Sequence, residues 1–436
     1  MLYFKIGLRN LARQKRRSFL LGGAIVFGVL IITLLNGIAM TSAVNIRTNL
    51  SSFLAGHIFI TGKEKLPTGR TVSVIHDQSG ISAAIKKLDK YIRVITRRSK
   101  INNALLINGQ ETAYAKIDGI DWSAESYMTD KIRLAGGSWK KVIMQENSIV
   151  LSETITENLG LELGDIVLCQ MTTITGQENV VEFRLEGIMP GSGGFFALSA
   201  YANITFVNRC LNLQPGEYTD MGILFKDSSR IDELGNRFYA VLEAAHIPLF
   251  GRYNRNVESV TMESLQLQGK WKGVKYQFLT LNEIMSDIIE MLDGISRLGF
   301  IVFVILFIII MFGITNTYRM VVYERVREIG TMRALGMKKS LVSGIFYSEA
   351  FFLASLSYLT GMLAGLFILC CLASVDFGIG SDLYLFLDSG YPGFRVNGSL
   401  LLLNAGIVIV FSMFAVHFPA RKAANLTPAA AQRKYT

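Results

Sequence analysis

The sequence lacks the residue patterns on which most enzymes depend. It holds four histidines, His57, His76, His246 and His417, and none has metal-ligand spacing to a cysteine or an acidic cluster. No Gly-x-x-x-x-Gly-Lys-Ser/Thr sequence occurs, so the chain has no phosphate loop of its own. No Ser-His-Asp or Cys-His arrangement stands out. We therefore expect no catalytic residue, no metal site and no cofactor in this chain.

Cysteine is scarce as well, with four in the chain. Cys370 and Cys371 lie in an apolar run, where we expect packing residues. Cys169 and Cys210 fall in a long central segment, and sequence does not fix the distance between them. A disulfide between these two is left open.

Charge is also sparse: 18% of the 436 residues are charged and 50% are hydrophobic, and the mean hydropathy is +0.36. Four long stretches carry no charge except Glu349, and each supplies the roughly 20 apolar residues that a membrane crossing needs. They cover residues 18–46, 298–318, 340–373 and 396–420. The sequence thus predicts four transmembrane helices. For Glu349 we expect a structural partner rather than a proton relay, because no second ionisable residue lies in a span.

The net charge of +10 is confined to particular segments. Residues 1–18 hold six basic side chains and no acid, residues 319–340 hold six against two, and the tail after residue 418 adds four. Residues 47–296 hold 26 basic and 28 acidic residues. This alternation follows the positive-inside rule and places both termini in the cytoplasm. The basic charge therefore argues for membrane lipids as partners and against nucleic acid.

The expected order of segments follows from these spans. We predict a cytoplasmic amphipathic helix over 1–18, with a cleaved signal peptide as the alternative to an uncleaved first span. An extracytoplasmic domain covers 44–296, an extracytoplasmic loop 374–397 and a cytoplasmic tail 419–436. The transmembrane helices are predicted over 19–43, 297–318, 341–373 and 398–418.

The extracytoplasmic domain is predicted to be α+β, because strand and helix patterns mix along it. Residues 275–296 are predicted as a helix that continues into the second span, on a stripe that includes Phe278, Leu281 and Leu292. Strands are predicted at 57–61, 92–96, 104–107, 112–117, 149–151, 166–172, 180–188 and 221–225, and helices at 81–90, 153–159 and 229–245.

Residues 319–340 separate the second and third spans and crowd charge together. Val322, Val326, Ile329 and Met332 recur at helical spacing and predict a short helix with one apolar stripe. Arg325 and Glu328 are close enough along such a helix to pair. Gly336 stands where a helix end favours a left-handed residue. An ordinary basic loop between two membrane helices is the plainer interpretation.

The run Glu324-Arg-Val-Arg-Glu-Ile-Gly-Thr-Met-Arg-Ala-Leu-Gly336 closely resembles the coupling segment of the FtsX-like permease family, to which MacB-type exporters and the lipoprotein-releasing LolC and LolE subunits belong. The resemblance implies that this helix docks on a separate cytoplasmic ATPase. It implies coupling roles for Glu324, Arg325, Arg327, Glu328, Ile329, Gly330, Arg333, Ala334, Leu335 and Gly336.

Three further stretches add to the resemblance: residues 148–167 and 183–189 are similar to segments of MacB-type periplasmic domains, and residues 419–433 to the end of the family's chains. The family template implies a porter subdomain from about 45–117 and 218–268, with a β-rich insert over 118–217.

The resemblance implies a permease subunit of an ABC transporter in the inner membrane. ATP would bind to the separate ATPase, since this chain has no phosphate loop. A second permease subunit, identical or different, would complete the complex. The cargo would be a lipoprotein or another extracytoplasmic substrate, although the hook-like Pro-Phe motif of lipoprotein-releasing subunits is missing. Alternatives are a MacB-like efflux component, an FtsX-like regulator of cell-wall hydrolases, and a membrane-anchored binding protein without an ATPase.

Overall fold

The computed structural model of the chain describes residues 15–76, 78–190, 197–252, 269, 271–378 and 383–427. It divides into two compact units. The helical unit comprises Met1–Ser42, Met291–Val375 and Pro392–Thr436, and the sheet unit comprises Ala43–Glu290 and Asp376–Tyr391. The predicted amphipathic helix, up to residue 14, and the tail from residue 428 lie outside the described residues.

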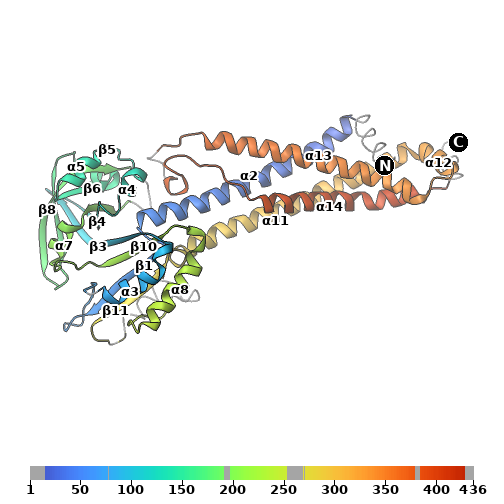
Figure 1. The fold of residues 1–436 in the computed structure, drawn as a ribbon. Helices are drawn as coiled ribbons and strands as arrows, with labels where there is room; N and C mark the ends of the chain where they lie inside the picture. Colours follow the sequence, from blue (N-terminus) through green and yellow to red (C-terminus); the bar gives the residue numbers. More distant parts are fainter. Residues whose placement is uncertain are drawn as a thin grey trace. The chain divides into compact units, whose positions relative to one another are not determined.

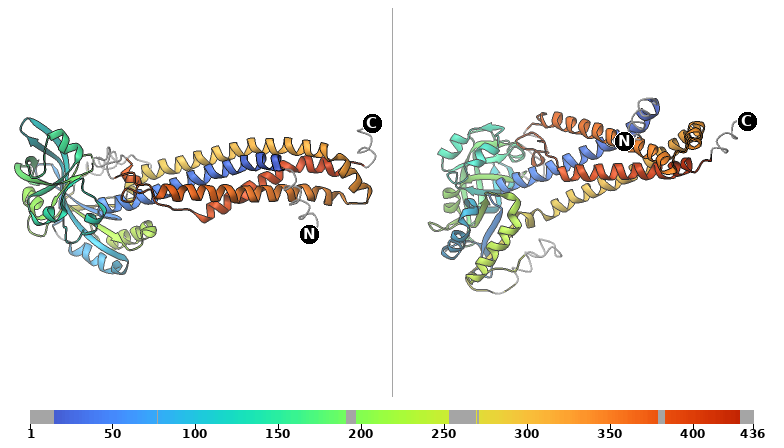
Figure 2. Two further views of the ribbon diagram at one scale, coloured as in Figure 1. Left: turned by 90° about the horizontal axis from the view of Figure 1, so that it is seen from above. Right: turned by 45° about the vertical axis from the view of Figure 1, so that its right-hand side comes forward.

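Within the described residues, four helices are long and apolar enough to cross a membrane, which confirms the predicted number. Within the helical unit they run lengthwise beside one another (Figures 1 and 2). Two of them extend well beyond the predicted spans, α2 at its C-terminal end and α11 at its N-terminal end. The helices are α2 (Lys15–Phe53), α11 (Ser286–Glu324), α13 (Lys339–Ala373) and α14 (Gly398–Ala424), with the short α12 (Val326–Ala334) between α11 and α13.

Small residues set the spacing between α2 and α13. A Cβ atom on Gly361 would come within 2.6 Å of the Val26 carbonyl oxygen, and one on Gly365 within 2.9 Å of Thr33 Cβ. In lipid, such close approach replaces the hydrophobic effect as the source of helix association. The α2–α13 contact therefore depends on glycine at these positions.

The sheet unit is built on one sheet in the order β11-β1-β10-β3-β4-β9-β6-β8-β5, with β2 on β1 and β7 pairing both β3 and β8. The α+β prediction is confirmed. The strands are β1 (Ile58–Lys65), β2 (Thr71–Ser73), β3 (Ile92–Asn108), β4 (Glu111–Ile120), β5 (Gly136–Gly137), β6 (Ser148–Ser152), β7 (Ile166–Thr172), β8 (Glu178–Met189), β9 (Ser199–Asn203), β10 (Asp220–Phe225) and β11 (Val274–Thr280). The α-helices described in this unit, besides the parts of α2 and α11 that it shares, are α3 (Ser79–Leu88), α4 (Tyr127–Lys131), α5 (Trp139–Met144), α6 (Glu153–Leu159), α7 (Ile204–Leu211), α8 (Ile231–Ala244) and α10 (Leu281–Ile284).

The predicted helix over 275–296 is wrong at its start, because Val274–Thr280 forms β11. Tyr276, Phe278 and Thr280 are buried at alternate positions, which is the period of a strand. The strand pairs along its whole length with β1. A helix begins only at Leu281, after Thr280 has capped it in a capping box with Glu283.

The predicted porter and insert share one sheet, and residues of both meet in one of its two large hydrophobic cores. Strand β3 is 17 residues long. Its first residue, Ile92, packs in a core with α3 and α8, whereas Ile101 and Leu106 pack with β6, β7 and β8. The boundary at residue 118 thus remains a prediction.

Cys169 and Cys210 are free thiols in this second core. Burial raises the pKa of Cys169 to about 12 and that of Cys210 to about 11. Neutral thiols pack here as small apolar groups.

A buried guanidinium ties the end of α2 to the sheet. Arg98 on β3 donates to the Phe53 carbonyl oxygen at 2.6 Å, to Asp118 at 3.1 Å and through two nitrogens to Glu125, the shortest at 2.6 Å. The side chains of Arg98 and Glu125 are 2% and 0% exposed. Each charge in this cluster is therefore paired and hydrogen-bonded, as burial requires.

Candidate functional site

The predicted coupling segment folds as a short helix set off from α11 by one residue. Arg325 lies between α11 and α12 with φ −99° and ψ 11°. Its N–H donates to the Val321 carbonyl oxygen at 3.0 Å, and its own carbonyl accepts from the Ile329 N–H at 2.9 Å. The hydrogen-bond ladder therefore continues through the change of direction, and α12 is connected to α11 by backbone as well as by packing.

One side of α12 is buried in the helical unit. Val322, Val326 and Ile329 belong to the predicted apolar stripe and are at most 5% exposed, and Met332 is half-buried. Ile329 shares a core cluster with Val342 of α13 and with residues of α14. Truncation of such a side chain typically costs about 2–5 kcal/mol. The stripe thus anchors α12 to the membrane-length helices.

The other side of α12 is open. Leu335 is 89% exposed, which leaves a large apolar side chain next to charged ones. Six of the ten predicted coupling residues are exposed: Glu324, Arg327, Glu328, Ala334, Leu335 and Gly336. Of the other four, Ile329 and Gly330 are buried, and Arg325 and Arg333 are half-buried. The exposed group offers both charges and an apolar contact to a partner.

The helix end confirms the predicted left-handed glycine. Gly336 has φ 89°, and the N–H groups of Gly336 and Met337 donate to the carbonyls of Arg333 and Met332. This is the double hydrogen bond of a Schellman motif. The Arg333 side chain also donates from Nη1 to the Met337 carbonyl oxygen at 2.7 Å. Three hydrogen bonds thus hold the turn that presents Leu335.

The predicted pairing of Arg325 with Glu328 is wrong, because the ion pair that the structure places on Arg325 is with Glu349 of α13. The Nη1 to Oε2 distance is 3.8 Å, and the two side chains are 13% and 1% exposed. The partner expected for the acid in the third span is thus a residue of the coupling segment. Sequence inspection missed this pair because the two residues are far apart along the chain.

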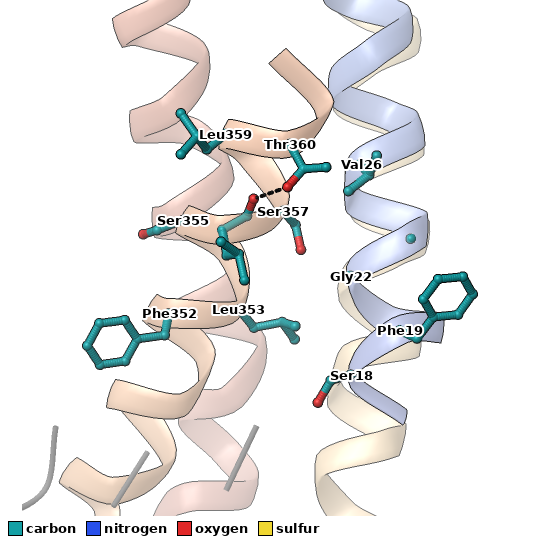
Figure 3. A pocket seen from close by; sticks show the side chains of 12 residues that line it. Ser18, Phe19, Gly22, Val26, Phe352, Leu353, Ser355, Ser357, Leu359 and Thr360 are labelled. Carbon is teal, nitrogen blue, oxygen red and sulfur yellow. Dashed lines mark hydrogen bonds between the residues drawn. The ribbon is translucent and has the colours of Figure 1, made fainter. Parts of the chain in front are cut away.

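An apolar groove of about 850 Å³ lies between α2 and α13 (Figure 3). Its polar lining consists of hydroxyl groups from Ser18, Ser355, Ser357 and Thr360. The Thr360 hydroxyl donates to the Leu356 carbonyl oxygen at 2.8 Å, within its own helix. No charged side chain of the described residues lines this groove. Its lining therefore suits an apolar chain better than an ion.

The described residues thus hold four membrane-length helices and, between α11 and α13, a short helix with one buried and one exposed side. Residues 300–428 match the family model described as FtsX-like permease C-terminal. The match covers less than half of the chain, so it shows a similarity of the C-terminal part to that family.

The chain is 22% identical over 294 residues to the lipoprotein-releasing system transmembrane protein LolC of Haemophilus influenzae. The match covers 66% of this chain and 64% of LolC, so the chain spans just under two thirds of that relative.

Two solved structures of transporter domains are also similar. The periplasmic region of MacB from Actinobacillus actinomycetemcomitans is 16% identical, with 53% of this chain and 92% of that one covered, at a TM-score of 0.28. The extracellular domain of the ABC-type transporter YknZ from Gram-positive bacteria is 11% identical, with 43% and 94% covered, at a TM-score of 0.27.

Proposed function

We propose that this chain is the permease subunit of an ABC transporter and that α12 receives the motion of a separate ATPase. The proposal rests on α12, which lies inside the FtsX-like match and has one buried side and one exposed side. ATP would bind and be hydrolysed on the partner. The chain would lie in the inner membrane with both termini in the cytoplasm and would pair with a second permease subunit.

Motion would enter through the exposed residues Arg327, Glu328 and Leu335. Ile329 holds α12 in the helical core, Val326 is buried beside it in the sequence, and the Arg325–Glu349 pair joins α12 to α13. A displacement of α12 would therefore move the membrane-length helices rather than bend a free loop. Packed cores transmit such displacements because they have few intermediate arrangements.

The chain topology supplies a route outward. Strand β1 follows α2 and strand β11 precedes α10 and α11, and the two strands pair from Ile58↔Thr280 to Glu64↔Val274. The Leu281 N–H also donates to the His57 carbonyl oxygen at 2.9 Å. Both helices thus connect to one pair of neighbouring strands, so a change in either would reach the same part of the sheet.

The cargo we favour is a lipoprotein or another substrate already outside the membrane. The relative LolC is named for lipoprotein release, and the groove between α2 and α13 offers no charged lining among the described residues. Four spans give little wall for a wide channel. Capture of a lipoprotein by the purified complex would support this choice, whereas capture of a tunnel-forming adaptor or a cell-wall hydrolase would point to efflux or regulation.

The exposed residue Glu328 gives the direct mutational test. Glu328→Arg should leave membrane insertion intact and uncouple ATP hydrolysis from cargo movement, because it reverses a charge on the docking side without touching the buried stripe. Glu290→Arg, an exposed charge reversal near the other end of α11, is the matched control and should behave as wild type. Full transport by Glu328→Arg would contradict the proposal.

A further inference from the structure

A small basic pocket lies in the sheet unit beside the last turns of α2. Its volume is about 210 Å³, and its lining includes Arg47, Arg93, Lys131, Lys226 and His57. No carboxylate of the described residues lines it. Four cationic groups around one cavity repel one another unless an anion joins them.

Two of these cationic side chains, Lys131 and Lys226, have a partner outside the pocket lining. Lys131 pairs with Asp388 at 2.7 Å, and Lys226 donates to the Lys90 carbonyl oxygen at 3.0 Å. The Nε atom of Arg47 is buried without a hydrogen-bond partner. Neither Arg47 nor Arg93 has a salt bridge to an acid of the described residues. The pocket thus holds two guanidinium groups, of half-buried Arg47 and exposed Arg93, that form no ion pair with an acid of the described residues.

The pKa of His57 is affected by both guanidinium groups. Burial, and then the charges of Arg47 and Arg93, lower the pKa of His57 to about 4. The imidazole is therefore neutral at physiological pH. Its Nδ1 accepts the Phe225 N–H at 2.9 Å, which leaves the proton on Nε2 as a donor. The pocket lining is thus rich in hydrogen-bond donors as well as positive.

We propose that this pocket binds the phosphate group of a phosphoester. A guanidinium presents a planar fork of N–H donors that matches phosphate oxygens, and two such forks with a neutral imidazole donor suit one phosphate. The volume accommodates a headgroup but not a whole lipid.

Two sources share this chemistry. Arg47 is the first charged residue after the uncharged run over 18–46, and a long basic side chain at the end of such a run can reach lipid headgroups. A lipid phosphate is therefore one source and a soluble phosphoester the other. The inference does not depend on an ATPase partner, so it stands or falls separately from the coupling proposal.

Binding can be measured on the full chain in a phosphate-free maltoside detergent at constant ionic strength. One arm titrates sn-glycerol 3-phosphate, and the other adds phosphatidylglycerol and counts retained lipids by native mass spectrometry. Saturable binding in the lipid arm alone assigns a headgroup, and binding in the first arm assigns a soluble phosphoester. Arg47→Gln or Arg93→Gln should weaken binding at least about tenfold, since each removes charge-assisted hydrogen bonds.

The control is Arg184→Gln, which removes an exposed arginine of β8 and should leave binding unchanged. Folding is checked by the thermal midpoint without ligand. Arg47→Gln should raise that midpoint, because it removes a partly buried charge without a partner. The proposal is overturned if neither arm saturates with the wild-type chain, or if Arg184→Gln weakens binding as much as the pocket variants do.

Discussion

Arg325 Nη1 lies 3.8 Å from Glu349 Oε2, so the residue at which α11 gives way to α12 is joined to a carboxylate of α13 that is 1% exposed. A buried ion pair of this kind is weak support for stability but fixes a geometry, because either charge alone is costly in that environment. The pair is therefore a candidate for the joint through which α12 acts on α13.

Replacing Arg325 by Met should destabilise the protein by about 3–5 kcal/mol, because the buried carboxylate of Glu349 would lose the cation that pairs with it. The double variant Arg325→Met/Glu349→Met should regain most of that stability, yet remain defective in ATPase-driven cargo movement. Thermal unfolding in nanodiscs checks the first point and a transport assay the second. Arg327→Met, which removes an exposed neighbour, is the stability control. Equal losses in the single and double variants would argue against the pair.

Arg98→Met should be among the most damaging single changes in the sheet unit, at about 3–5 kcal/mol, because it strands Glu125 and Asp118. Arg98→Lys should also destabilise, since one ammonium group cannot reach Glu125, Asp118 and the Phe53 carbonyl together. Arg97→Met is the matched control: this exposed neighbour stacks over Tyr218, a contact worth about 1 kcal/mol. Urea unfolding of the full chain would rank the three, and similar losses for Arg97 and Arg98 would refute the assignment.

Two histidines should give pH dependences of opposite sign. His57 has a folded pKa of about 4, below its ordinary 6.5, so the unfolded chain binds more protons between these values. Stability should therefore fall as pH drops from 6.5 toward 4, by up to about 3 kcal/mol. His57→Gln should flatten this part of the profile in thermal unfolding from pH 8 to 4.

For His76, partial burial disfavours the charged form, but hydrogen bonds to Glu64 and Glu217 and their charges outweigh it and raise the pKa. Its contribution is present below pH 6.5 and is lost as pH rises through the raised value. His76→Gln should therefore lose stability on the acid side only. A variant that lost stability only above pH 7 would contradict this sign.

Cys169 and Cys210 should resist alkylation in the native chain. They are 0% and 3% exposed, and burial keeps both thiols protonated. Iodoacetamide at pH 8 should modify them only after denaturation, as mass spectrometry of the peptides would show, and reductant should not change gel mobility. Rapid native labelling of Cys169 would contradict the buried placement.

Local signals were sufficient for part of this architecture. The spacing of the apolar residues Val326 and Ile329 predicts α12, and Gly336 predicts its end. Both signals are local, because each involves residues within about one helical turn. The sequence predicts strand β3 as two pieces, since a polar stretch interrupts its apolar pattern where the structure has a register shift between Ile101 and Ala104.

Non-local relationships could not be predicted in the same way. The sequence predicts a helix where β11 forms, because Phe278 fits both a helical stripe and an alternating pattern, and only the pairing of β11 with β1 decides between them. The partner of Glu349 was likewise undetermined, because helix packing, rather than spacing along the chain, brings Arg325 to it.

Coupling requires contact between the open side of α12 and a separate ATPase, and photo-crosslinking from position 335 tests that contact most directly. A photoreactive residue in place of Leu335, which is 89% exposed, should yield a covalent adduct with an ABC ATPase in native membranes. The same residue in place of Tyr114, 66% exposed on β4, should not. Adducts with lipid alone at position 335, in membranes where the transporter is active, would contradict the account.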